Sequence, residues 1–152
     1  MDNWYELEKK LVDWLSGFSS EKIMFRNSYQ SIVGFPNSGF RSDGMLTDGN
    51  ILIAIEVEAG QMHPDTNVGK YWYLDDEYKK YSKIILFHVY TPAFNSYEWR
   101  MRLASFYAGK MKDSFPFDYR LFDYRKEEGF ENVFRKLKLE IELTLKQNFG
   151  IS

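Results

Sequence analysis

Three acidic residues lie on either side of a segment whose composition predicts a tight turn. Asp43 precedes residues 48–50, which read Asp-Gly-Asn, and Glu56 and Glu58 follow them. Because these turn residues tolerate positive φ, the segment is typical of a hairpin between two antiparallel strands. Such a hairpin would bring the three carboxylates together, and hard cations such as Mg²⁺ prefer oxygen ligands grouped in this way. These residues therefore predict a divalent-metal site.

The placement of the turn decides how Asp43 and Glu56 meet. A turn at residues 48–49 makes Glu56 the diagonal neighbour of Asp43, whereas a turn at residues 49–50 places the two directly opposite each other. In both registers they share one face, with Cβ atoms about 4.5 to 5.5 Å apart when opposite and about 7 Å apart when diagonal. A slip by one residue would send Asp43 to the other face. Glu58 shares the face of Glu56 because side chains alternate along a strand.

The strand that carries the two glutamates is apolar on both faces over most of its length. One face reads Ile51, Ile53, Ile55 and Val57, and the other reads Leu52, Ala54, Glu56 and Glu58. A strand of this kind is typical of the centre of a sheet that is covered on both sides. Its terminal acids would then open into a cleft. The alternative is that the three acids are ordinary surface and turn residues.

This arrangement of acids resembles the PD-(D/E)XK superfamily of restriction-endonuclease-like nucleases. These enzymes are Mg²⁺-dependent phosphodiesterases built on a core of order αβββαβ. The resemblance implies that Asp43, Glu56 and the backbone carbonyl of Val57 bind Mg²⁺ or Mn²⁺. Glu58 stands where the motif usually has lysine, as in a minority of members, and would help to position the attacking water or a second ion. The sequence departs from the motif in having Ser42, not proline, before the aspartate.

Two residues of the next predicted helix could complete the site. Asn67 and Lys70 lie in its first turns, on the side that faces back towards the acidic strand. In some members of the superfamily an active-site residue has moved to this helix, so Lys70 could supply the cation that is missing at Glu58. The alternative for Lys70 is an exposed helix lysine.

Three further residues have weaker signals. Gln61, just past the acidic pair, could orient water or phosphate. Glu8, on the first helix, resembles an acid that some members of the superfamily place there. His88 lies within an apolar strand, so we expect a hydrogen-bonded core residue and not a ligand.

Hydrophobic periodicity predicts a single α/β domain over residues 1–152. Its elements follow the order αβββαβαβα, with a mixed central sheet flanked by helices. The resemblance implies that this is a restriction-endonuclease-like three-layer fold. The expected helices cover residues 4–18, 64–81, 96–112 and 130–149, and the expected strands cover 23–33, 39–47, 50–59, 82–90 and 117–124.

Composition limits the possible classes of protein. The chain of 152 residues has no cysteine, so thiolate metal sites and disulfides are excluded. Its start lacks the pattern of a signal peptide, and no apolar run approaches the roughly 18 residues of a membrane helix, so we expect a cytoplasmic protein without a membrane partner. The formal net charge of -2 argues against phosphate binding by the whole surface. Local clusters such as Arg100, Arg102, Lys110 and Lys112 could still bind phosphate.

The function that these observations favour is hydrolysis of phosphodiester bonds by a metal-dependent endonuclease, with DNA as the expected nucleic acid. A small enzyme of this kind that cuts both strands would work as a symmetric homodimer. Two other classes remain open. One is a catalytically inactive nuclease-fold module that binds nucleic acid or protein, and the other is a carboxylate-pair glycosidase.

Overall fold

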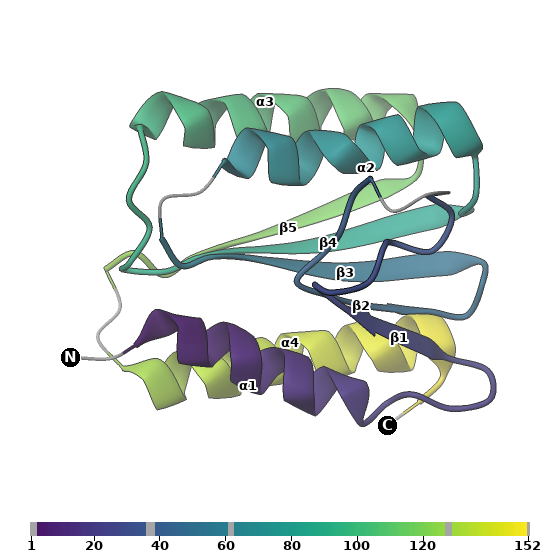
Figure 1. Ribbon diagram of the computed structural model, residues 1–152, viewed down its shortest axis with the longest axis horizontal. Coiled ribbons are helices and arrows are strands. Elements are labelled where there is room, and N and C mark those ends of the chain that lie inside the picture. Colours follow the sequence, from purple (N-terminus) through teal and green to yellow (C-terminus); the bar gives the residue numbers. More distant parts are fainter. Residues whose placement is uncertain (1–2, 36–38, 61–62, 127–128, 152) are drawn as a thin grey trace.

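A mixed five-stranded sheet forms the centre of the protein, and a pair of helices covers each of its faces (Figure 1). The computed structural model describes residues 3–35, 39–60, 63–126 and 129–151. Within these ranges the elements are α1 (Trp4–Ser16), β1 (Met24–Asn27), β2 (Gly44–Thr47), β3 (Ile51–Glu58), α2 (Pro64–Tyr78), β4 (Lys83–Tyr90), α3 (Glu98–Ser114), β5 (Phe117–Asp123) and α4 (Phe130–Phe149). The predicted order αβββαβαβα and the α/β class are confirmed.

The strands lie in the order β1-β2-β3-β4-β5. The first three pair antiparallel, as hairpin connections require, and β3, β4 and β5 pair parallel because α2 and α3 cross over between them. β3 is therefore the central strand, as its two apolar faces predict. Its carboxyl end, the start of β2 and the start of α2 meet at one edge of the sheet (Figure 1).

Two hydrophobic layers hold the helices on the sheet. On one side, Leu7, Leu11 and Leu15 of α1 pack with α4 against the odd-numbered residues of β3. These leucines recur every four residues, so they form one apolar face of the helix. On the other side, α2 and α3 pack against Leu52 and Ala54 of β3. Because β3 is covered on both faces, polar groups at its end are shielded from bulk water.

The hairpin adopts the second of the two predicted registers. Thr47 pairs with Leu52 and Gly44 pairs with Ile55, so Asp43, the next residue, comes opposite Glu56. Gly49 has a φ of 93°, which explains why glycine stands in this turn. The acidic pair is thus brought together by an antiparallel register that a one-residue slip would destroy.

The strands β1 and β2 are shorter than predicted. Residues 28–35 and 39–43 lie outside the sheet, and among them Ile32 is buried under α2 with its N–H donating to the carbonyl of Phe40. β2 begins only at Gly44 because the carboxylate of Asp43 accepts the N–H of Val57, which takes the place of a backbone partner.

Three helices also differ from the predictions. α1 ends at Ser16 instead of residue 18. α2 ends at Tyr78 instead of residue 81, because Lys79 adopts a left-handed conformation with a φ of 49°. The predicted helix stripe residue Tyr81 is instead buried beyond the helix, where its hydroxyl donates to the carbonyl of Val33. α3 is displaced by two residues and covers Glu98–Ser114.

Replacing Asp48 by alanine should destabilise the hairpin. Oδ1 of Asp48 accepts the N–H groups of Asn50 at 2.9 Å and Ile51 at 2.8 Å. We expect Asp48→Ala to lower the free energy of unfolding by about 1 kcal/mol in a urea titration, and Asp48→Asn, which keeps the acceptor, to lower it less. An unchanged midpoint for Asp48→Ala would show that the turn does not depend on these bonds.

Candidate active site

The edge of the sheet where β2 begins and β3 ends opens into a hollow that we call the acidic hollow. It has a volume of about 290 Å³. Its lining residues come from the loop before β2, from the end of β3 and from the start of α2, and they are Ser28, Arg41, Ser42, Asp43, Glu56, His63, Thr66, Asn67 and Lys70. Two of the predicted metal ligands and two of the predicted helix residues therefore line one space.

Asp43 and Glu56 are held by the backbone and by α2. Oδ2 of Asp43 accepts the N–H of Val57 at 2.7 Å. Because the N–H and C=O of one strand residue point to the same edge, the carbonyl of Val57 also faces this side of β3, beyond the start of β2. Oε2 of Glu56 accepts the hydroxyl of Tyr71 at 2.6 Å.

Lys70 reaches into the acidic hollow from the second turn of α2. Its Nζ lies 2.9 Å from Oε2 of Glu56, and the two side chains are only 6% and 3% exposed. The ammonium group also donates to the carbonyl of Arg41 and, at 3.5 Å, to Oδ1 of Asn67. Lys70 is therefore a buried cation of the site and not an exposed helix lysine.

Burial dominates the electrostatics of the two acids. It raises the pKa of Glu56 from 4.5 to about 8, with a further contribution from Asp43 and opposition from Lys70 and Tyr71. Burial likewise raises the pKa of Asp43, although the N–H of Val57 and the charge of Lys70 oppose this. Burial therefore makes both carboxyls hold their protons to a higher pH than an exposed acid does.

Glu8 joins the site from α1, as its predicted accessory role requires. Burial raises its pKa from 4.5 to about 8, and the charge of Asp43 and a hydrogen bond to Asp43 raise it further. Glu8 and Asp43 also line a neighbouring hollow of about 380 Å³ between α1 and the loop after β1. The protonated carboxyl of Glu8 donates to the carboxylate of Asp43, which lets the two acids lie side by side.

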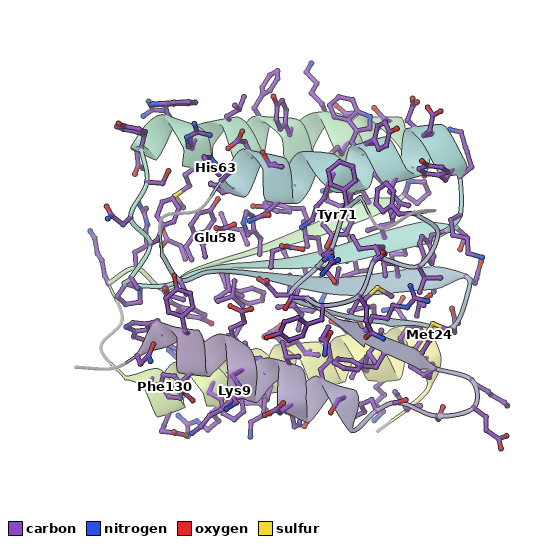
Figure 2. The ribbon with its side chains drawn as sticks, in the orientation of Figure 1. Lys9, Met24, Glu58, His63, Tyr71 and Phe130 are labelled. Atoms are coloured by element: carbon purple, nitrogen blue, oxygen red, sulfur yellow. The ribbon has the colours of Figure 1, made fainter. Side chains whose placement is uncertain are left out.

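Glu58 does not line the acidic hollow, and its buried side chain bonds to Asn67 and His88. Oε1 of Glu58 accepts the side-chain amide of Asn67 at 2.7 Å and lies 2.8 Å from Nε2 of His88. Glu58 and His88 are both 0% exposed, and Nδ1 of His88 lies 2.6 Å from the hydroxyl of Tyr119. Figure 2 shows Glu58 between the sheet and α2, close to His63 at the start of that helix. His88 is a hydrogen-bonded core residue, as predicted.

Three buried polar atoms of this region have no hydrogen-bond partner among the described residues. They are Oγ of Ser42, Oε2 of Glu58 and the hydroxyl of Tyr90. A buried carboxylate oxygen without a partner carries a desolvation cost. Glu58 is therefore less completely satisfied than Glu56.

The structure thus places Asp43, Glu56, Asn67 and Lys70 around one hollow. Glu8 lines the neighbouring hollow, and Glu58 contacts the site through Asn67. Gln61 lies outside the described residues. Sequence reasoning assigned Tyr71 to the core and missed its bond to Glu56. The signal was available, since Tyr71 follows Lys70 on the face of α2 that packs on the sheet.

The side chains alone do not form a complete metal centre. In the part of the chain that the structure describes, no group of three or more His, Asp or Glu side chains is arranged to hold a metal ion. The carboxylates of Asp43 and Glu56 line the acidic hollow, and the backbone of Val57 is bonded to Asp43 beside it.

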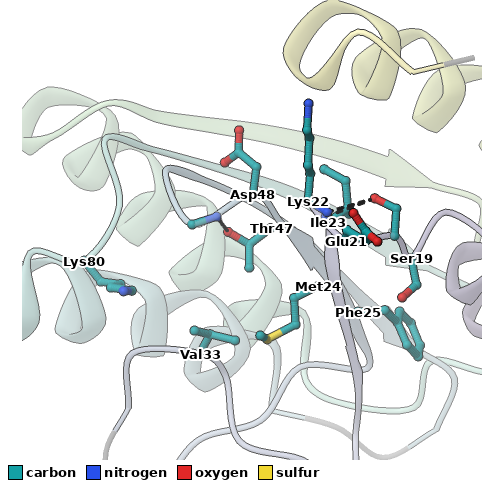
Figure 3. Close-up of a pocket in the computed structure, with 12 residues that line it drawn as sticks. Ser19, Glu21, Lys22, Ile23, Met24, Phe25, Val33, Thr47, Asp48 and Lys80 are labelled. Atoms are coloured by element: carbon teal, nitrogen blue, oxygen red, sulfur yellow. Dashed lines mark hydrogen bonds between the residues drawn. The ribbon is translucent and has the colours of Figure 1, made fainter.

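A larger hollow of about 450 Å³ lies at the far end of the hairpin, against β1 and the turn (Figure 3). Its charged lining residues are Glu21, Lys22, Asp48 and Lys80. Asp48 is already bonded to the turn, and the figure shows the remaining charges spread around the hollow instead of converging. The acidic hollow is smaller but has the denser set of functional groups.

No family model matches the chain, and neither curated proteins nor solved structures contain a significant match to it. Among the described residues, no helix is long and apolar enough to cross a membrane. Functional inference therefore depends on the geometry of the site.

The raised pKa values predict how stability depends on pH. Glu56 and Glu8 bind their protons more tightly in the folded chain, with pKa values of about 8, than in the unfolded chain, where they are near 4.5. Their contribution to the free energy of unfolding is fully present below about pH 4.5 and is lost as the pH rises to about 8. In metal-free buffer we expect Glu56→Gln and Glu8→Gln each to flatten the fall in unfolding free energy over this range. For the control Glu21→Gln, which changes an exposed residue, the unfolding free energy should fall with pH as it does in the parent. Parallel curves for all variants would contradict the assignment.

Proposed function

We propose that this protein is a metal-dependent nuclease that hydrolyses phosphodiester bonds of nucleic acid, with DNA as the expected substrate. The observation that carries the proposal is the convergence of Asp43, Glu56 and the buried ammonium of Lys70 on one open hollow at the carboxyl end of β3. This is the placement that the resemblance to the PD-(D/E)XK nucleases implies, with the lysine supplied from α2. The order αβββαβαβα and the mixed sheet are consistent with that fold.

The donor set suits magnesium or manganese. Mg²⁺ keeps several water ligands and is commonly bound through one or two carboxylates. The carboxylates of Asp43 and Glu56, which lie opposite each other across the hairpin, and the carbonyl of Val57 would hold it. When bound, such an ion polarises the scissile phosphate and lowers the pKa of an attacking water.

The residues of the chain would divide the remaining work. Tyr71, fixed in the core, orients the carboxylate of Glu56 through its hydroxyl. Lys70 places a positive charge beside the hollow, where it can stabilise the extra negative charge of a pentacovalent phosphate. Its ammonium group has three donors, so it can bind phosphate while it still contacts the carbonyl of Arg41.

Glu58 acts through Asn67 in this proposal. Glu58 fixes the amide of Asn67, whose oxygen in turn lies 3.5 Å from the ammonium of Lys70. The sequence-based role for Glu58, which is to position water or a second ion, stays a prediction. Oε1 already bonds to Asn67 and His88, so this role would fall to Oε2, which has no partner among the described residues.

The second candidate is a nuclease-fold binding module without turnover. It is favoured by the ion pair that Lys70 already makes with Glu56 and by the lack of a three-residue metal group among the described side chains. The two candidates differ in cleavage with divalent ions. A homodimer would place two such sites on a duplex, and this assembly stays part of the nuclease proposal.

Removal of either predicted ligand should abolish cleavage. We expect Asp43→Ala and Glu56→Ala to lose Mg²⁺- and Mn²⁺-dependent nicking of plasmid DNA and cleavage of single strands, because the ion loses half of its carboxylate ligands. Both variants should remain folded, since each removes a buried acid whose pKa is raised. The exposed Asp113→Ala should cut as the parent does. If both ligand variants cut normally, the proposed site is wrong, and a parent inactive with every divalent ion would favour the binding module.

Substitution of Lys70 separates a catalytic cation from a substrate contact. Losing one preorganised electrostatic donor commonly costs about 10² to 10³ in rate, so Lys70→Met should lower kcat by this factor with a smaller change in KM. The exposed Lys146→Met on α4, which packs on the other face of the sheet, serves as the control. An unchanged kcat with a salt slope reduced by about one unit would make Lys70 a phosphate contact only.

A further inference from the structure

An exposed aromatic patch lies at the start of α3, and we define it as Tyr97, Trp99 and Arg100. The rings of Tyr97 and Trp99 stack with their centroids 6.0 Å apart and their planes 13° from parallel. Tyr97 is 67% exposed and Trp99 is 47% exposed, although large aromatic side chains usually bury most of their surface. The guanidinium carbon of Arg100 lies 4.7 Å from the centre of the Trp99 ring.

The patch is held in place before any ligand arrives. Tyr97 precedes the first residue of α3, and its carbonyl accepts the N–H of Arg100 at 3.0 Å. Arg100 is in turn fixed by an ion pair of 3.3 Å with Asp65 of α2. An exposed stack whose members are already ordered pays little conformational entropy on binding.

The same contacts place the patch beside the acidic hollow. Asp65, which binds Arg100, is flanked in the chain by residues of α2 that line the hollow, including Thr66. In addition, the loop that leads to Tyr97 is bonded to the loop that follows β3, because the N–H of Asn95 donates to the carbonyl of Gly60 at 2.9 Å. A chain bound in the hollow would therefore pass close to the stacked rings.

The charges around the patch favour stacking over phosphate neutralisation. Arg100 is paired with Asp65, and Arg125 is paired with both Asp123 and Glu98. The chain as a whole has a net charge of -2. Duplex binding depends mainly on free cations that neutralise phosphates, whereas single strands can be held by aromatic rings on which exposed bases stack.

We propose that Tyr97 and Trp99 form a platform on which unpaired bases of single-stranded nucleic acid stack next to the acidic hollow. The proposal deepens the proposed function, and it rests on that function for the role of the neighbouring site. It assigns single strands, or duplexes with unpaired ends or bubbles, as the substrate class in preference to intact duplex.

The test is binding of the full chain to a fluorescein-labelled oligothymidylate in EDTA, measured by anisotropy. EDTA prevents cleavage, so the measurement reads binding alone. We expect Tyr97→Ala and Trp99→Ala each to weaken binding about 5- to 100-fold, and Trp99→Phe, which keeps a ring, to weaken it less. The salt dependence should be shallow in the parent and unchanged in these variants, because stacking releases no counterions.

Phe106→Ala is the matched control. Phe106 is an aromatic residue of the same helix, is 58% exposed and has Lys110 near its ring, but it lies about two turns further along α3. The ring planes of Phe106 and Tyr107 are 52° apart, so these two rings do not form a parallel stack. We expect Phe106→Ala to bind oligothymidylate with the affinity of the parent. Urea unfolding of each variant verifies that it is folded.

The outcomes separate the platform from the nuclease. Equal affinities for Trp99→Ala and Phe106→Ala, tighter binding to a blunt duplex than to oligothymidylate, or no measurable binding of oligothymidylate would each overturn the platform. If binding depends on Tyr97 and Trp99 but no divalent ion supports cleavage, the platform stands and the nuclease proposal fails. If the protein cuts while both alanine variants bind normally, the nuclease proposal stands and the platform fails.

Discussion

The ion pair between Lys70 and Glu56 is the interaction on which the candidate site depends. Moving two charges out of water is costly, and their attraction offsets the cost only when other hydrogen bonds satisfy the remaining donors and acceptors. Here the hydroxyl of Tyr71 donates to Glu56, and the carbonyl of Arg41 accepts from Lys70. The pair therefore joins β3, α2 and the loop before β2 at one point. Without Glu56, Lys70 would keep its bond to the carbonyl of Arg41 and its attraction to the charge of Asp43, whereas without Lys70 the carboxylate of Glu56 would lose its cation.

The sequence predicted that Asp43 and Glu56 lie together because the alternation of β3 and the turn residues led to the same placement. Alternation along β3 and the turn residues 48–50 restricted the hairpin to two registers, and both placed Asp43 and Glu56 on one face. The choice between them was not predictable, because the same three residues permit either turn. The structure shows what selects the register. Asp48 accepts two N–H groups of the turn, and the carboxylate of Asp43 accepts the N–H of Val57, so both ends of the hairpin are fixed.

The partners of Glu58 could not be predicted, because they come from elements distant in the chain. Strand alternation correctly placed Glu58 on the face of Glu56, but its neighbours are set by the parallel register, in which Glu56 pairs with His88 and Glu58 with Tyr90. A single sequence contains no signal for that register beyond the apolar runs themselves. Since His88 lies beside Glu58, its imidazole takes the oxygen that a metal could have used. The same limit explains why the sequence could not decide whether Lys70 is a cation of the site or an exposed helix lysine, because that depends on how α2 lies over the sheet.

The packing of α2 explains how a strand end becomes a site. Asn67, Lys70, Tyr71 and Leu74 follow the i, i+3, i+4, i+7 pattern, so they form one face of the helix. Leu74 and the ring of Tyr71 are buried against the sheet and anchor that face in the core. Because the face is continuous, the same packing carries Asn67 and Lys70 over the carboxylates at the end of β3. The polar geometry is thus set by apolar contacts one to two turns away, and a change in the packing of Leu74 would shift the ammonium of Lys70 as surely as a change in the site itself.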